Sequence, residues 1–208
     1  MLLPYGLLGN GSQANETQDF GSPDPVLFRA VSSDFLDDAS GDLVDIADPG
    51  AERIDVPVIA AVGAPGLRRE LIGLWGGRNY RTLVSATSWV SDSAVLGAGT
   101  VVAPQAAVST GAVLGAHVLL NLAGTVSHDT WVGDYATLSP GVSVAGNCRI
   151  GEGVFIGIGA SVSNGVSIVA GAVIGAGSVV LTDITTPGIY VGAPARKIRD
   201  QEAWLHVL

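Results

Sequence analysis

The residues of this chain best suited to acid–base chemistry are neighbours, His128 and Asp129. An imidazole titrates near neutral pH, so histidine is the usual general base when an attacking amine or hydroxyl must lose a proton. A carboxylate beside the ring can orient it or make it more basic. Taken alone, a histidine of this kind is more often an ordinary surface residue, so the surrounding pattern has to decide.

A second feature that could serve a function, in this case ligand binding, is the G-x-G-x-x-A turn GNGSQA at residues 9–14. Small residues in such a turn let a phosphate or a ribose approach the backbone, and the N-terminus of a following helix favours anions. A single motif of this kind is weak evidence, because a tight strand-to-helix turn has the same sequence. A dehydrogenase is not indicated, since it would need a larger domain and an acid about twenty residues further on.

His128 lies within a long repeat. From Val90 to Val180 every sixth residue is Val, Leu or Ile without a break, and the fourth residue after each is mostly small. A six-residue period of aliphatic, often β-branched residues is typical of a parallel β-helix, whose short strands stack their aliphatic side chains from coil to coil. A helix would need a period of about 3.6 residues, and a flat strand would need strict alternation. Because positions 126 and 130 point inward, we expect the His128 ring to point outward.

The segment before the repeat predicts a small parallel α/β domain, Rossmann-like in its order of elements. Residues 2–9, 26–31, 58–62 and 81–84 are predicted strands. Residues 15–20 predict a short helix, and 67–75 an amphipathic helix with its apolar face at 67, 71, 72, 74 and 75 and Pro65 in the first turn. The acidic segment 34–48 is expected to be solvated surface. The predicted domains are therefore 1–85, the β-helix 86–186 and a C-terminal tail 187–208.

Composition argues against several classes of partner. The net charge of −9 at pH 7 disfavours nucleic acid or an anionic membrane surface. No apolar run reaches the roughly 18 residues of a membrane-spanning helix, and the N-terminus lacks the basic start of a secretory signal. The single cysteine, Cys148, stands at an inward position and is expected to be a core residue rather than a nucleophile. These observations favour a cytoplasmic protein.

Three segments carry a resemblance to known proteins: NLAGTVSHDTWVGD at 121–134, SPGVSVAGN at 139–147 and VGAPARKI at 191–198. With the small α/β domain ahead of the repeat, the chain resembles the hexapeptide-repeat acetyltransferases of the sialic acid O-acetyltransferase type. That family includes enzymes that acetylate nucleotide-linked 4-amino-sugars, and the likeness covers nearly the whole chain. It implies a mainly β fold with a left-handed β-helix of eighteen residues per coil, a homotrimer, and acetyl-CoA as co-substrate with no metal.

The resemblance also implies roles for single residues. His128 would be the general base, Asp129 its partner, and Gly146, one coil further on, the backbone N–H donor to the oxyanion. Acetyl transfer would be direct, in a ternary complex without an acyl-enzyme. The expected CoA contacts are Thr137, Ile158 and Ala176 in the channel and Arg196 and Lys197 at a phosphate. The expected substrate contacts are Gly9, Asn10, Gly11, Ser12, Gln13, Gly63 and Asn121.

The sequence departs from the family in ways that leave the acceptor open. Gln13 stands where histidine is common, the second strand ends in Arg29-Ala30-Val31 without the usual acids, and Thr137 replaces a second histidine of some members. The sugar, its nucleotide, the choice of N- or O-acetylation and the length of the acyl group are therefore undetermined.

Two other classes of function compete with the acetyltransferase. The γ-type carbonic anhydrases hold zinc with three histidines on a similar β-helix. The remaining histidines here, His117 and His206, lack such a context and are expected to be structural or surface residues. A non-catalytic β-helix scaffold or binding protein is the other alternative.

Overall fold

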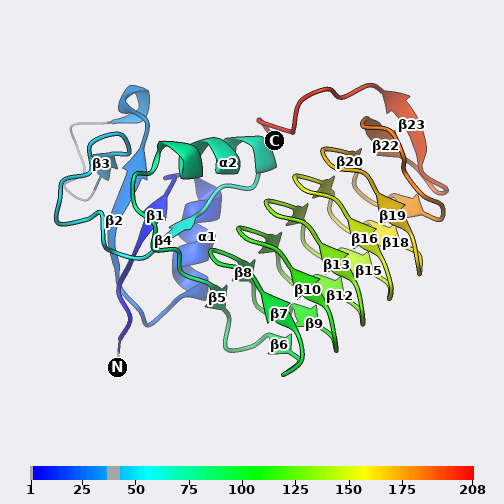
Figure 1. The fold of residues 1–208 in the computed structure, drawn as a ribbon, viewed down its shortest axis with the longest axis horizontal. Coiled ribbons are helices and arrows are strands. Elements are labelled where there is room, and N and C mark those ends of the chain that lie inside the picture. The colour runs from blue at the N-terminus through cyan, green and yellow to red at the C-terminus, as the bar shows by residue number, and fades with distance from the viewer. Residues whose placement is uncertain (1, 37–42) are drawn as a thin grey trace.

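The computed structural model describes residues 2–36 and 43–208, and shows an N-terminal α/β region beside a long β-helix (Figure 1). The fold is mainly β, with parallel sheets and few helices. Residues 37–42 of the predicted acidic segment lie outside the described residues. The part from 43 onward differs from the expected solvated surface, because it forms a strand and Ile46 is only 1% exposed.

The N-terminal region contains a parallel sheet in the order β3-β2-β1-β4. Its strands are β1 (Tyr5–Leu8), β2 (Val26–Val31), β3 (Leu43–Asp45) and β4 (Val58–Ala60). Parallel neighbours need a crossover, and α1 (Ser12–Phe20) provides it between β1 and β2. A short 3-10 helix, η1 (Ser33–Phe35), follows β2, and α2 (Pro65–Leu74) follows β4 with Pro65 in its first turn, as predicted.

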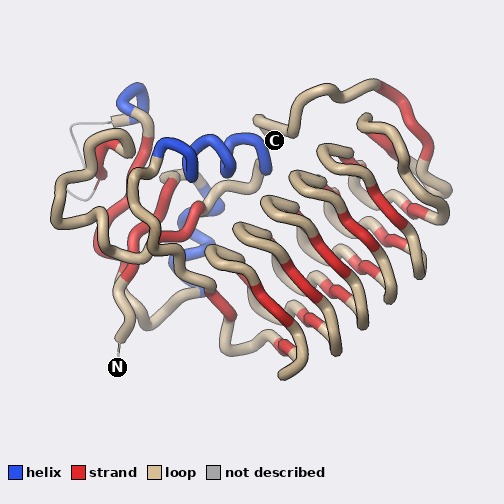
Figure 2. Tube along the Cα trace, viewed as in Figure 1, coloured by secondary structure: helices blue, strands red, loops and turns tan. Residues whose placement is uncertain are grey.

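The β-helix is built from three sheets of two-residue strands, which Figure 2 shows as short segments separated by turns. The first sheet contains β5 (Leu83–Val84), β8 (Val101–Val102), β11 (Leu119–Leu120), β14 (Thr137–Leu138), β17 (Phe155–Ile156) and β20 (Val173–Ile174). The second contains β6 (Trp89–Val90), β9 (Ala107–Val108), β12 (Thr125–Val126), β15 (Ser143–Val144), β18 (Ser161–Val162) and β21 (Val179–Val180). The third contains β7 (Val95–Leu96), β10 (Val113–Leu114), β13 (Trp131–Val132), β16 (Arg149–Ile150) and β19 (Ser167–Ile168).

Each coil stacks in register on the next. Val113, for example, pairs with Val95 and Trp131, eighteen residues away on either side. We name the turns by the sheets they join: the first corner (such as 121–124) links the first and second sheets, the second corner (127–130) the second and third, and the third corner (133–136) the third and first. Residues eighteen apart therefore share a corner.

The aliphatic residues of the repeat form one continuous core. All of those at the sixth positions from Val102 to Val180 are buried, and Cys148 is fully buried, as the sequence predicted. Burying one such side chain contributes about 1.5–3 kcal/mol. Burial also raises the pKa of the Cys148 thiol, which makes it a poor nucleophile.

The N-terminal region packs on the outer face of the first sheet. Tyr5, Leu7 and Ile59 form one buried cluster with Val101 and Leu119, which point outward from the β-helix. The predicted strand 81–84 contains β5, and β5 pairs with β8, so this strand belongs to the first sheet of the β-helix. The N-terminal region and the β-helix therefore share a buried cluster and are directly continuous at this strand.

The C-terminal segment extends the first sheet and then returns to α2 (Figure 1). Strand β22 (Ile189–Val191) pairs with β20, and β23 (Arg196–Arg199) pairs antiparallel with β22. Beyond it, the Trp204 ring lies against Gly153 and Gly171 and beneath the Arg69 guanidinium, 4.0 Å from the ring centroid. No helix in the described ranges is long and apolar enough to cross a membrane.

His117 at the third corner is a buried structural histidine, as the sequence suggested. It is 5% exposed, and its ring stacks on Tyr135 with the centroids 5.2 Å apart. Burial lowers its pKa from 6.5 to about 4, and the Arg68 charge adds to this while Asp134 opposes it. The ring is therefore neutral in the folded protein at neutral pH.

This histidine should make folding sensitive to acid. Its folded-state pKa lies below the unfolded value, so the unfolded chain takes up the proton first as the pH falls. We expect the free energy of unfolding to decrease between about pH 6.5 and 4, by at most about 3 kcal/mol from this group. Thermal unfolding across this range measures the slope. Asparagine tolerates the φ of 55° at this position, so His117→Asn should flatten the profile, and an unchanged slope would contradict the assignment.

Candidate functional site

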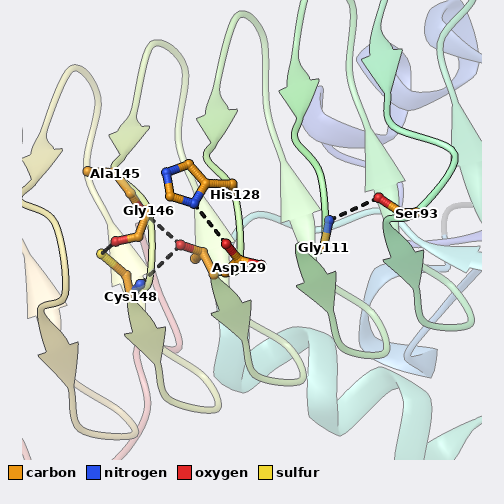
Figure 3. Close-up of polar contacts among 8 residues, drawn as sticks. Ser93, Gly111, His128, Asp129, Ala145, Gly146 and Cys148 are labelled. Carbon is orange, nitrogen blue, oxygen red and sulfur yellow. Dashed lines mark hydrogen bonds and ion pairs between the residues drawn. The ribbon is translucent and has the colours of Figure 1, made fainter.

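His128 and Asp129 form an exposed pair at the second corner, between β12 and β13 (Figure 3). His128 Nδ1 lies 2.9 Å from Asp129 Oδ2, and the two side chains are 54% and 63% exposed. The prediction that the ring points outward is thus confirmed. An ionised carboxylate can only accept, so Nδ1 carries the proton and donates it, and Nε2 is left as the proton acceptor.

The backbone of the coil produces this pairing. Asp129 has a φ of 57°, and the equivalent residues of neighbouring coils, Gly111, Asn147 and Gly165, also have positive φ. Glycine, asparagine and aspartate are the residues that tolerate this left-handed conformation best. The repeat therefore presents a left-handed turn at this corner, and an aspartate there places its carboxylate beside the preceding histidine.

Gly146 lies directly against the His128 ring, as the eighteen-residue stacking predicted (Figure 3). A Cβ at this position would be 2.6 Å from both Cε1 and Nε2 of the ring. Within residues 2–36 and 43–208, the Gly146 N–H has no backbone or side-chain acceptor. A free N–H beside a basic nitrogen is the combination that acyl transfer requires, one group for the proton and one for the oxyanion.

Replacing Gly146 with alanine should therefore displace the imidazole. We expect kcat for group transfer at this site to fall by about 10²-fold, the effect of misplacing a reacting group by about 1 Å. Gly73→Ala is the matched control, because Gly73 is exposed on α2 and no atom lies within 4 Å of a Cβ built there. It should keep full turnover and gain about 0.5–1 kcal/mol of stability. Wild-type turnover by Gly146→Ala would show that the ring does not act from its observed position.

A cavity of about 350 Å³ lies between the N-terminal region and the first sheet. Six of the residues that the sequence singled out line it: Gln13, Gly63, Asn121, Thr137, Ile158 and Ala176. Asn121 Nδ2 donates to Gln13 Oε1 at 3.3 Å, although the two residues are far apart in sequence. Gln13 Nε2 is buried without a protein partner among the described residues, so it is a donor available to a ligand.

A second cavity of about 420 Å³ lies at the carboxyl edge of the N-terminal sheet. The predicted turn residues Gly9, Asn10 and Gly11 line it together with Ser32, Phe35 and Val62. This edge is where open parallel sheets usually bind ligands. Arg29 donates to Asn10 Oδ1 and Asn15 Oδ1 at 2.8 Å each, which ties the turn to α1, and Ser12 begins that helix.

The structure does not bring all the predicted residues together. His128, Asp129 and Gly146 lie at the second corner, whereas Asn121 and the turns after β14, β17 and β20 lie at the first corner. Arg196 and Lys197 are exposed on β23 and line neither cavity. Lys197 instead pairs with Asp200, Nζ to Oδ1 at 2.6 Å.

The sequence analysis missed two residues near the cavities. Arg68 is 2% exposed, and Leu208 reaches the 350 Å³ cavity beside Gly63. The signal for Arg68 was its spacing from Leu71 and Trp75, which puts all three on the buried face of α2. Leu74 was assigned to that face wrongly, because it is 45% exposed. Nothing in the local sequence marks Leu208.

In the part of the chain that the structure describes, no three His, Cys, Asp or Glu side chains cluster closely enough to hold a metal ion. His206 lies on the returning C-terminal segment, with Nε2 2.7 Å from Glu70 Oε2, and is the surface residue that the sequence suggested.

The chain thus combines a β-helix of hexapeptide coils, an exposed histidine–aspartate corner and a small α/β region on the outer face of the first sheet. No family model and no curated protein matches the sequence. Solved structures do. The acetyltransferase domain of PglB from Neisseria gonorrhoeae FA1090, in complex with acetyl coenzyme A, is 27% identical with a TM-score of 0.81, covering 95% of this chain and 100% of that one.

Two further structures are similar over the same length. A mutant of perosamine N-acetyltransferase from Caulobacter crescentus, in complex with CoA and GDP-perosamine, is 26% identical with a TM-score of 0.85, covering 95% of this chain and 97% of that one. WeeI from Acinetobacter baumannii AYE shares the fold at 22% identity and a TM-score of 0.80, covering 95% and 100%. These similarities confirm the resemblance to the hexapeptide-repeat sugar acetyltransferases.

Proposed function

We propose that this protein is an acetyl-CoA-dependent sugar acetyltransferase with His128 as the general base and a nucleotide-linked sugar as the acceptor. The observation that carries the proposal is the His128 ring, which is bonded to Asp129 through Nδ1 and packs against Gly146, whose N–H has no acceptor among the described residues. The similar structures with bound acetyl coenzyme A, or with CoA and GDP-perosamine, support the donor and the class of acceptor.

The proposed reaction is a direct transfer. The acceptor amine or hydroxyl attacks the thioester carbonyl carbon and gives its proton to His128 Nε2. The carbonyl oxygen becomes an oxyanion that accepts a hydrogen bond from the Gly146 N–H. Collapse of the tetrahedral intermediate breaks the C–S bond, and the CoA thiolate takes the proton from the imidazolium. Asp129 holds the ring and balances its transient charge.

The two cavities supply the binding surfaces in this proposal. The acetyl-CoA arm lies along Thr137, Ile158 and Ala176, while Gln13, Gly63 and Asn121 face the acceptor sugar in the same cavity. The nucleotide lies on the turn of Gly9, Asn10, Gly11 and Ser12, in a Rossmann-like unit ahead of a left-handed β-helix. Arg196 and Lys197 remain candidates for a CoA phosphate. The domain bounds 1–85, 86–186 and 187–208 and the cytoplasmic location also stay predictions.

The separation of His128 from the 350 Å³ cavity favours a homotrimer. In one chain they occupy different corners of the β-helix, so the proposed base and binding surface meet only if His128 faces the cavity of an adjacent copy. We expect light scattering to give three times the chain mass at assay concentration. A monomer under those conditions would leave the proposed site without its base.

A panel of acceptors tests the function. The wild-type protein is incubated with acetyl-CoA and either GDP-perosamine or dTDP-4-amino-4,6-dideoxyglucose, and release of the CoA thiol is measured. We expect thiol release that depends on the acceptor, with a product whose mass is greater than that of the acceptor by one acetyl group in place of one hydrogen. Hydroxylamine cleaves an ester but not an amide, so it distinguishes O- from N-acetylation. Bound zinc and hydration of CO₂, without thiol release, would favour the metalloenzyme instead.

A further inference from the structure

Arg68 is a buried cation whose partners are all neutral oxygens. Nε donates to the His117 carbonyl at 2.9 Å, Nη1 to the Val62 carbonyl at 2.6 Å, and Nη2 to Thr137 Oγ1 at 2.9 Å. Longer bonds reach the carbonyls of Gly63 and Ala136, and a further bond reaches that of Tyr135. Among the described residues no carboxylate pairs with it. A charge is costly to bury, so this arrangement needs the full set of hydrogen bonds.

The acceptors belong to parts of the chain that are distant in sequence. Val62 and Gly63 form the turn between β4 and α2, whereas His117 and Tyr135 belong to successive coils at the third corner. Thr137 closes the network, because its hydroxyl donates to the Gly63 carbonyl at 2.7 Å. Arg68 thus fixes the turn 62–63 against the β-helix.

That turn separates the two cavities. Val62 lines the 420 Å³ cavity, and Gly63 lines the 350 Å³ cavity with Thr137. We infer that Arg68 is a positioning residue that sets the spacing between the two cavities, so that an acceptor spanning both, a sugar with its nucleotide, presents its reacting group in register with the acetyl group. This inference rests on the proposed function.

The inference distinguishes two acceptors of the same sugar. GDP-perosamine would occupy both cavities, so the position of its reacting group depends on the spacing between them. Free perosamine would occupy only the cavity beside Thr137, and the position of the nucleotide cavity is then irrelevant. A residue needed merely for folding would affect both acceptors equally.

The test compares kcat/KM for GDP-perosamine and for free perosamine, with dTDP-4-amino-4,6-dideoxyglucose and its free sugar as a second pair. Lysine lacks the planar fork and cannot hold all the acceptors, so Arg68→Lys should lower kcat/KM for the nucleotide-linked sugar by about 10²-fold. For the free sugar we expect less than about a threefold change on the same reasoning. Arg69→Lys is the matched control, because Arg69 is the exposed neighbour on α2, and it should change neither value.

Thr137 gives a second test that preserves the buried charge. Thr137→Val removes the hydroxyl that joins Arg68 to Gly63. Thr137 also lies along the proposed acetyl-CoA arm, so both acceptors should lose some activity. The readout is therefore the ratio of kcat/KM for the nucleotide-linked sugar to kcat/KM for the free sugar, which we expect to fall about 10-fold. Thr137→Ser keeps the hydroxyl and should restore the wild-type ratio. If Arg68→Lys does not fold, the comparison of Thr137→Val with Thr137→Ser tests the positioning role instead.

The failures are distinguishable. Equal losses for both acceptors, or a lowered melting temperature with unchanged kinetics, would overturn the positioning role while the proposed function stands. A wild-type protein that releases no thiol with any acceptor would overturn the proposed function, and the inference with it.

Discussion

Replacing His128 with alanine should lower kcat by about 10²–10⁴-fold, the usual contribution of a general base. The physical reason is that the imidazole beside Gly146 is then absent, and the acceptor has no group to take its proton. The melting temperature should hardly change, because the side chain is 54% exposed and lies outside the core of the β-helix. The affinity for acetyl-CoA, measured by calorimetry, should also change little.

Two further variants are compared with His128→Ala, one at the same site and one outside it. Asp129→Asn leaves an oxygen that can accept from His128 Nδ1 but removes its charge, so kcat should fall less than in His128→Ala. His206→Ala is the matched control, because His206 is also exposed and paired with a carboxylate but lies outside the proposed site. It should retain turnover. Near-wild-type kcat in folded His128→Ala would remove the proposed base.

The fold could be predicted because a β-helix is locally determined. Each coil contacts only its neighbours, so the six-residue period from Val90 to Val180 specifies which side chains point inward. The coil length of eighteen residues, which the family resemblance implies, predicts that Gly146 lies against His128, and the structure has it there. The left-handed turn at Asp129 follows from the same repeat.

The features that the sequence did not reveal depend on contacts between distant segments. Asn121 meets Gln13 only because the N-terminal sheet packs on the outer face of the first sheet. The spacing of Arg68 from Leu71 places it on the buried face of α2, but only the fold brings its partners Val62, His117 and Thr137 around it. The returning C-terminal segment, with Trp204 against Gly153, has no periodic signal at all.

The residue that best tests the register of the coils is Ile156. It is fully buried on β17, where it pairs with Leu138 and Ile174 of the adjacent coils. Ile156→Asp would place a carboxylate among stacked aliphatic side chains with no partner. Such a charge costs at least several kcal/mol, here about 3–5. We expect aggregation, or a melting temperature lower by about 6–20 °C.

Ser161→Asp provides the comparison, because it introduces the same charge on the next strand, β18, at an exposed outward position. A charge in water costs little, so its melting temperature should stay within a degree or two, about 0.5 kcal/mol. The contrast isolates the direction in which each side chain points, since both variants introduce an aspartate on neighbouring strands of the same coil. Equal melting temperatures for the two variants would mean that Ile156 does not face the core, and the assignment of inward and outward positions throughout the repeat, including the exposure of His128, would fail with it.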